Sequence, residues 1–158
     1  MTMKNKNKIM RSYKQELLGS LEKIFPLLCP VREKEWLPGW EYNMIFSESG
    51  YAEKGCVFET NNEYGTYHWV MTLHNIDKGE IQFVKTSEKE DVIIDISIEE
   101  QHENLSYCNI QYTFIPMSSA AYHSMTEENS DEDFRSHMRK WEETLNYYLI
   151  HNEMINES

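Results

Sequence analysis

A long amphipathic segment near the C-terminus, residues 130–150 (SDEDFRSHMRKWEETLNYYLI), constrains the fold more than any other part of the sequence. Its large apolar side chains recur at spacings of four, three, four and three residues, which places them on one stripe of an α-helix. Ser130 is a favourable N-cap, Asp133 stands at the capping-box position, and the acidic residues 131–133 complement the positive end of the helix dipole. A helix with this stripe needs a partner surface. The stripe consists of Phe134, Met138, Trp141, Leu145 and Tyr148.

The chain before this helix consists mostly of short segments in which apolar and polar residues alternate, as in half-buried β-strands. In residues 94–99, for example, every second residue is an isoleucine. Proline and glycine break up residues 19–40, where we expect two short helices, at 21–25 and 31–36, and a turn at Pro38 and Gly39. The predicted strands are residues 8–17, 42–47, 56–60, 66–74, 81–85, 92–99 and 105–115.

Short loops between the later strands predict antiparallel neighbours, with the first strand joining at one edge. We therefore expect an α+β domain in which a curved sheet of seven antiparallel strands packs against the one long helix. One helix cannot easily fill so wide a sheet, so aromatic residues with polar groups would line a remaining cavity. The alternative is that these residues pack against one another as ordinary core. The domain is expected to span residues 8–150, between an N-terminal tail, 1–7, and a C-terminal tail, 151–158.

The formal net charge of −12 would repel a nucleic-acid backbone or an anionic lipid surface, so we expect no nucleic-acid partner. No apolar run is long enough to span a bilayer, and the N-terminus lacks the apolar segment of a secretion signal, so membrane insertion is not expected. Cys29, Cys56 and Cys108 lie far apart and form no CxxC pair, which argues against a disulfide framework and a zinc site. We expect a cytoplasmic protein.

Histidines are the natural candidates for acid or base chemistry, but they do not converge on one place. His68 and His74 are separated by an even number of positions, so a regular strand would place both opposite Trp69, toward solvent. His137 follows the edge of the helical stripe beside Met138. The glycine-rich, zinc-protease and nucleophile-elbow motifs of the common cofactor-dependent and hydrolytic sites are absent from the sequence. No cofactor and no metal are therefore expected.

Four stretches of the chain resemble the Bet v 1-like, or START/polyketide cyclase (SRPBCC), superfamily, in particular small microbial members of unassigned function. The resemblance extends over residues 8–150, and its most specific part ends in Glu33, Trp36, Pro38, Gly39 and Trp40. The stretches are 25–40 (FPLLCPVREKEWLPGW), 50–60 (GYAEKGCVFET), 68–75 (HWVMTLHN) and 111–114 (QYTF).

The resemblance implies a helix-grip fold, in which a strand, two short helices, six strands and a long C-terminal helix enclose a deep cavity. Members of this superfamily bind plant hormones and sterol-type lipids, cyclise polyketides, or act as Aha1-like modules. They share a hollow fold rather than one catalytic motif, so no catalytic residue can be transferred to this chain.

We therefore expect a monomer or weak dimer that binds a small hydrophobic or amphipathic ligand, such as a lipid, a sterol-like or a polyketide-like molecule. The alternatives are a polyketide cyclase or dehydratase, which a polar group of shifted pKa in the cavity would favour, and an Aha1-like module that binds a protein partner. Trp36 and Trp40 either frame the cavity or anchor the Pro-Gly turn. The expected ligand-binding residues are Trp36, Trp40, Tyr67, Trp69, Met71, Phe83, Tyr112, Phe114, Met138, Trp141 and Tyr148.

Overall fold

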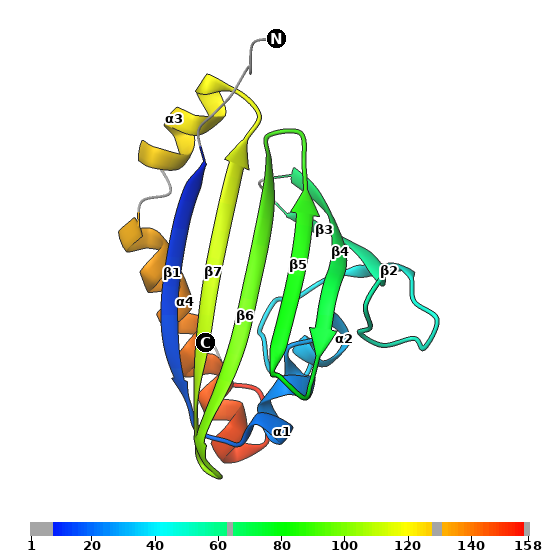
Figure 1. Cartoon of the computed structure of the whole chain (residues 1–158), viewed down its shortest axis with the longest axis vertical. Coiled ribbons are helices and arrows are strands. Elements are labelled where there is room, and N and C mark those ends of the chain that lie inside the picture. The colour runs from blue at the N-terminus through cyan, green and yellow to red at the C-terminus, as the bar shows by residue number, and fades with distance from the viewer. Residues whose placement is uncertain (1–7, 63–64, 128–130, 157–158) are drawn as a thin grey trace.

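Seven antiparallel strands form one curved sheet, and a long helix lies across its concave face (Figure 1). The computed structural model describes residues 8–62, 65–127 and 131–156. The strands are β1 (Ile9–Leu17), β2 (Asn43–Phe46), β3 (Val57–Asn62), β4 (Gly65–Asn75), β5 (Glu80–Thr86), β6 (Glu90–His102) and β7 (Leu105–Pro116). The helical segments are α1 (Leu21–Ile24), η1 (Phe25–Leu27), α2 (Pro30–Glu33), α3 (Ser119–Glu127) and α4 (Asp131–His151).

The order of the strands in the sheet is β1-β7-β6-β5-β4-β3-β2, so β1 and β2 lie at opposite edges. The short helical segments between them carry the chain from one edge to the other around one end of the sheet (Figure 1). This arrangement agrees with the predicted element order. The bounds differ in places: β3 continues through Asn61 and Asn62, beyond the predicted end at residue 60, α2 ends at Glu33, and α3 was not predicted.

The short helices begin where local chemistry allows. The Ser20 hydroxyl accepts a hydrogen bond from the Lys23 amide at 3.2 Å and so caps α1. Pro26 and Pro30 occupy first-turn positions of η1 and α2, where their missing amide hydrogen has no helical partner to lose. The predicted N-cap of α4, Ser130, lies outside the described residues.

The long helix is fixed to β1 by side-chain hydrogen bonds. The buried Gln15 amide donates to the Met138 carbonyl at 3.0 Å. The Asn146 side chain accepts from the Leu18 amide and donates to the Glu16 carbonyl, both at 2.9 Å. The predicted apolar stripe faces inward: Met138 and Leu145 are fully buried, and its three aromatic members pack against the core.

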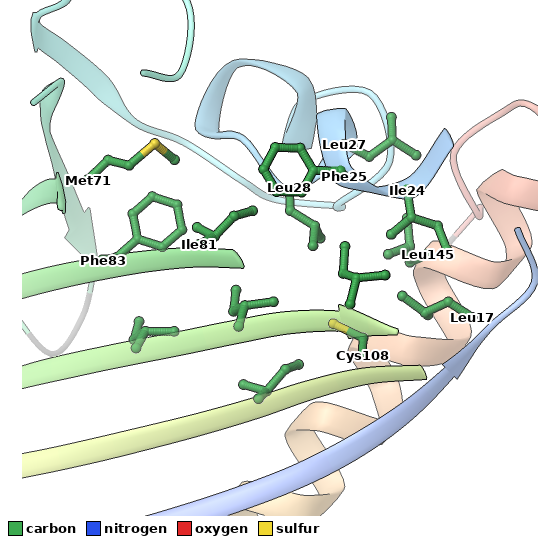
Figure 2. Close-up of a cluster of buried hydrophobic side chains, with 14 of the residues drawn as sticks. Leu17, Ile24, Phe25, Leu27, Leu28, Met71, Ile81, Phe83, Cys108 and Leu145 are labelled. Carbon is green, nitrogen blue, oxygen red and sulfur yellow. The ribbon is translucent and has the colours of Figure 1, made fainter. Parts of the chain in front are cut away.

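The hydrophobic core is concentrated at the end of the sheet where the short helices cross. Figure 2 shows the side chains of Ile24, Phe25, Leu27 and Leu28 on the side of the core opposite Ile81 and Phe83 of β5, with Leu17 and Leu145 at one end. The second half of α4 closes this core, so its first half stands over the remaining part of the sheet.

The expectation for His74 was wrong, because β4 is not regular. The pairing of β4 with β5 shifts between Met71 and Leu73, which is the effect of a β-bulge. After the shift, His74 pairs with the buried Ile81 and therefore points inward, where its ring lies 4.9 Å from that of Phe25. Burial lowers the pKa of this histidine.

Gly79, in the turn between β4 and β5, offers a test of this packing. Its φ is +67°, and an added Cβ would lie 2.8 Å from both the Ile98 carbonyl oxygen and the Leu21 side chain. Gly50 has a φ of +84° with nothing within 4 Å of the added atom. We expect Gly50→Ala to lower the free energy of unfolding by about 1 kcal/mol through backbone strain, and Gly79→Ala to lower it by about 1–3 kcal/mol more through the clash. Urea unfolding of both variants measures the difference, and equal losses would contradict the packing described here.

Candidate functional site

A cavity of about 520 Å³ lies between the concave face of the sheet, the first half of α4 and the chain around residues 37–41. Strands β3 to β7 supply its floor, and residues 137–144 of α4 supply its roof. Volumes of this size are typical of small-molecule sites in proteins. The cavity lies where residues 137–144 of α4 cover the sheet without filling the space above it.

Aromatic rings form much of the cavity wall. Trp69 is at the centre: its ring is stacked on Phe58 at 5.2 Å and meets Phe83 and Trp40 edge to face at 5.8 and 6.3 Å. Ile94 and Ile96 extend the apolar surface across β6. The wall thus offers flat apolar surface to a ligand of similar thickness.

Seven of the predicted ligand-binding residues line this cavity, namely Trp40, Tyr67, Trp69, Phe83, Tyr112, Met138 and Trp141. The other four lie elsewhere. Trp36 is fully buried behind Trp141, with the two rings stacked at 6.0 Å, and Met71 is fully buried in the core. Phe114 packs against the far side of Tyr112 at 5.7 Å, and the Tyr148 hydroxyl donates to Glu35 at 2.9 Å.

The two tryptophans of the Pro-Gly segment have different roles. The Trp36 indole donates to the Leu27 carbonyl at 2.8 Å, so this side chain anchors the segment. The Trp40 indole donates to the Pro30 carbonyl, also at 2.8 Å, while its ring lines the cavity. Trp40 therefore both frames the cavity and anchors the Pro-Gly turn, whereas Trp36 only anchors the segment.

Lys85 is a cavity residue that sequence reasoning missed. Its Nζ lies 4.6 Å from the ring centroid of Tyr67, 4.8 Å from that of Trp69 and 6.0 Å from that of Tyr112. The described residues provide this nitrogen with aromatic faces and no hydrogen-bond acceptor. Burial lowers the pKa of Lys85 to about 8, against the opposing charge of Glu90. Strand alternation contained the signal, because Lys85 is two positions after the buried Phe83.

Glu33, the last residue of α2, is a second missed group. It was noted only as part of the sequence resemblance, yet its side chain is buried and lines the cavity. Among the described residues, its carboxyl group has no hydrogen-bond partner. Burial raises the pKa of Glu33 to about 8, so the group is mostly a neutral carboxylic acid at pH 7.

Two further polar groups of the cavity wall lack a protein partner in the part of the chain that the structure describes. They are the Tyr112 hydroxyl and the buried indole nitrogen of Trp141. Burial and the nearby Glu33 raise the pKa of Tyr112, so its hydroxyl stays protonated. By contrast, the Tyr67 hydroxyl donates to Glu90 at 2.8 Å, and the Trp69 indole donates to Thr60 at 3.0 Å.

The mouth of the cavity is polar. Exposed residues at its rim include Glu41, Asn61, His137 and Lys140. Partial desolvation beside the cavity, together with the positive charges of Lys85 and Lys140, lowers the pKa of His137.

Other kinds of site find no support in the described ranges. All three cysteines are free and buried. No cluster of acidic, histidine and cysteine side chains suited to a metal ion is present among residues 8–62, 65–127 and 131–156. Within the same residues, no helix has the length and apolar character needed to cross a membrane.

The buried Glu33 should make stability depend on pH. Its pKa is 4.5 in an unfolded chain and about 8 in the fold, so between these values the folded protein holds a proton that the unfolded chain has released. The free energy of unfolding should therefore fall as pH rises from 4.5 to 8, by up to about 5 kcal/mol from this group. We expect Glu33→Gln to remove most of that fall in denaturant titrations at several pH values, whereas Glu103→Gln, in an exposed loop, should keep it. Parallel curves for wild type and Glu33→Gln would contradict this assignment.

No family model matches the sequence, and no curated protein is significantly similar to it. Solved structures are similar. Norcoclaurine synthase from Thalictrum flavum, in complex with dopamine and hydroxybenzaldehyde, is 8% identical with a TM-score of 0.69, over 93% of this chain and 89% of the synthase. Ara h 8.0201 is 10% identical with a TM-score of 0.62, over 91% and 99% of the two chains. An uncharacterised protein from Bacillus thuringiensis is 15% identical with a TM-score of 0.56, over 90% and 99%.

At these identities the likeness establishes the fold and no more. The seven-stranded antiparallel sheet, the early short helices and the long C-terminal helix recur in these neighbours. The chain therefore has the Bet v 1-like helix-grip fold.

Proposed function

We propose that this protein binds a small amphipathic molecule in the cavity between the sheet and α4. One observation carries the proposal: an aromatic cavity of about 520 Å³ is lined by four polar groups that make no hydrogen bond with the described residues, and one of them, the Trp141 indole nitrogen, is fully buried. Leaving a buried polar group unpaired costs about 1–3 kcal/mol, so a bound molecule that pairs them is stabilised. The four groups belong to Glu33, Lys85, Tyr112 and Trp141.

The chemistry of these groups indicates the polarity of the ligand. An ammonium and an indole can only donate hydrogen bonds, and a neutral carboxylic acid and a phenol can also donate. A complementary ligand therefore carries oxygen acceptors, such as carbonyl, hydroxyl or ether groups, at one end. Its other end is apolar and lies against Trp69, Phe58 and Phe83.

Charge favours a neutral ligand over an anion. The chain has a formal net charge of −12, which repels anions at long range. Burying about 300 Å² of apolar ligand surface would contribute on the order of 7–8 kcal/mol before the costs of association. The polar groups would then determine which of many apolar molecules binds. The structural neighbour crystallised with dopamine and hydroxybenzaldehyde shows that this fold can hold small aromatic molecules.

A second candidate function is catalysis of the cyclase or dehydratase type. The observation that favours it is the presence of two groups with pKa values near 8, Glu33 and Lys85, in the lining of one cavity. Such values allow proton transfer near neutral pH. The Aha1-like alternative has less support, because side chains do not fill the cavity.

Free, buried cysteines are consistent with a reducing compartment, so we place the protein in the cytoplasm. We also propose that it is a monomer or a weak dimer.

Native mass spectrometry of the protein purified from cells, followed by solvent extraction, is the first test of binding. We expect a reproducible small adduct, neutral and oxygen-containing, that is released on denaturation. A clean mass of the free chain from cells, together with no binding from a library of neutral aromatic compounds, would refute the proposal.

Variants of the wall test where the ligand lies. Trp69→Ala removes the central ring and should weaken affinity for the identified ligand about tenfold or more. Val70→Ala, at the next position of β4 and exposed, is the matched control and should change affinity less than about twofold. Isothermal titration calorimetry measures both, and unchanged affinity for Trp69→Ala would place the ligand outside this cavity.

A further inference from the structure

We propose that Lys85 forms a Schiff base with a ligand that is a neutral aldehyde or ketone with an aromatic or other flat apolar body. This inference rests on the proposed function, since it concerns the same cavity and names the chemical class of its ligand. It also assigns a covalent step to a particular nitrogen atom.

The first argument is the position of the amine. Lys85 is near the end of β5, on the inward face that also carries Phe83, and it lines the cavity. Its Nζ is surrounded by the rings of Tyr67, Trp69 and Tyr112, at 4.6, 4.8 and 6.0 Å from their centroids. A flat molecule lying against Trp69 would bring its functional group within reach of this nitrogen.

The second argument is that the amine is not held by an ion pair. The described residues form no salt bridge with Nζ. Glu90 is the carboxylate that acts electrostatically on Lys85, and it already accepts a hydrogen bond from the Tyr67 hydroxyl at 2.8 Å. The ammonium is instead held over the faces of Tyr67 and Trp69, so its nitrogen lies among rings of the cavity lining without a carboxylate bound to it.

The third argument is protonation. A Schiff base requires the free lone pair of a neutral amine. Desolvation lowers the pKa of Lys85 to about 8, so about a tenth of the amine is neutral at pH 7, several hundred times more than for an exposed lysine. A neutral carbonyl compound also avoids the repulsion that the negative protein imposes on anions.

The reaction balances with the groups present. The lone pair of Nζ attacks the carbonyl carbon, a C–N bond forms, and a proton passes from nitrogen to the carbonyl oxygen to give a carbinolamine. Glu33, a neutral acid that lines the same cavity, protonates the hydroxyl, which leaves as water while the C=N bond forms. The iminium proton returns to the carboxylate. One water molecule is released, and no oxidant or reductant is needed.

Reductive trapping tests the proposal. The folded full-length protein is incubated with 2-naphthaldehyde and sodium cyanoborohydride, which reduces an imine to a stable amine. We expect one principal adduct whose mass increase equals that of the aldehyde less one oxygen atom, and peptide mapping should place it on Lys85. Lys85→Arg, which keeps a cation in the cavity but cannot form this bond, should lose at least nine-tenths of the adduct.

Lys14→Arg is the matched control. The Lys14 ammonium also lies over an aromatic ring, that of Tyr107 at 4.0 Å, but on the exposed outer face of the sheet. This variant should retain the wild-type yield. Labelling spread over surface lysines, or equal yields from wild type and Lys85→Arg, would overturn the proposal. Because mapping on the wild-type protein alone identifies the labelled residue, the test does not depend on how well a variant folds.

A non-condensing analogue separates this inference from the proposed function. 2-Naphthalenemethanol has the same ring system and cannot form an imine, and its binding can be followed by calorimetry. Binding of the alcohol without an adduct at Lys85 would overturn the Schiff base and leave the binding function standing. Failure of both the alcohol and the aldehyde to bind would overturn both.

Discussion

The cavity depends on how α4 is seated against the inside of the sheet. Its second half is fixed by burial of Leu145 and Leu149 and by the paired hydrogen bonds between Asn146 and the end of β1. Its first half is held by Gln15 through the Met138 carbonyl and by the buried Met138 side chain, and residues 137–144 cover the cavity. One helix thus closes a hydrophobic core at one end of the sheet and covers a hollow at the other. The packing of the second half of α4 stabilises the fold enough for the cavity to remain unfilled.

The position of α4 also determines where the short helices lie, and through them the position of Glu33 in the cavity. Trp36 is stacked on Trp141 of α4 and donates to Leu27, so the segment between β1 and β2 is held against the long helix. That contact sets the orientation of α2, whose last residue is Glu33. A carboxyl group buried without a partner opposes folding above its ordinary pKa. The tight packing of the two tryptophans offsets this cost and keeps the acid in the cavity wall.

The sequence predicted well what depends on local periodicity. The stripe from Phe134 to Tyr148 and the alternation in β6 and β7 each require one buried face, whatever the partner is. The bulge in β4 was not predictable, because it is defined by the partner strand. Lys85 and Glu33 were missed since charged residues are ordinarily expected on the solvent side, and a single helical turn such as α2 carries no periodicity that would orient Glu33. The weakly amphipathic α3 was missed for a similar reason.

The two missed residues make sense together. Desolvation shifts the pKa of an acid up and that of an amine down, and here both reach about 8. Near neutral pH the cavity therefore holds an acid that is mostly protonated and an amine that is partly deprotonated, inside a strongly negative protein. A ligand that carried a full charge would have to lose its hydration among aromatic rings. A neutral molecule with acceptor oxygens incurs no such penalty and meets donors on the wall, so the electrostatics of the cavity select for polarity without charge.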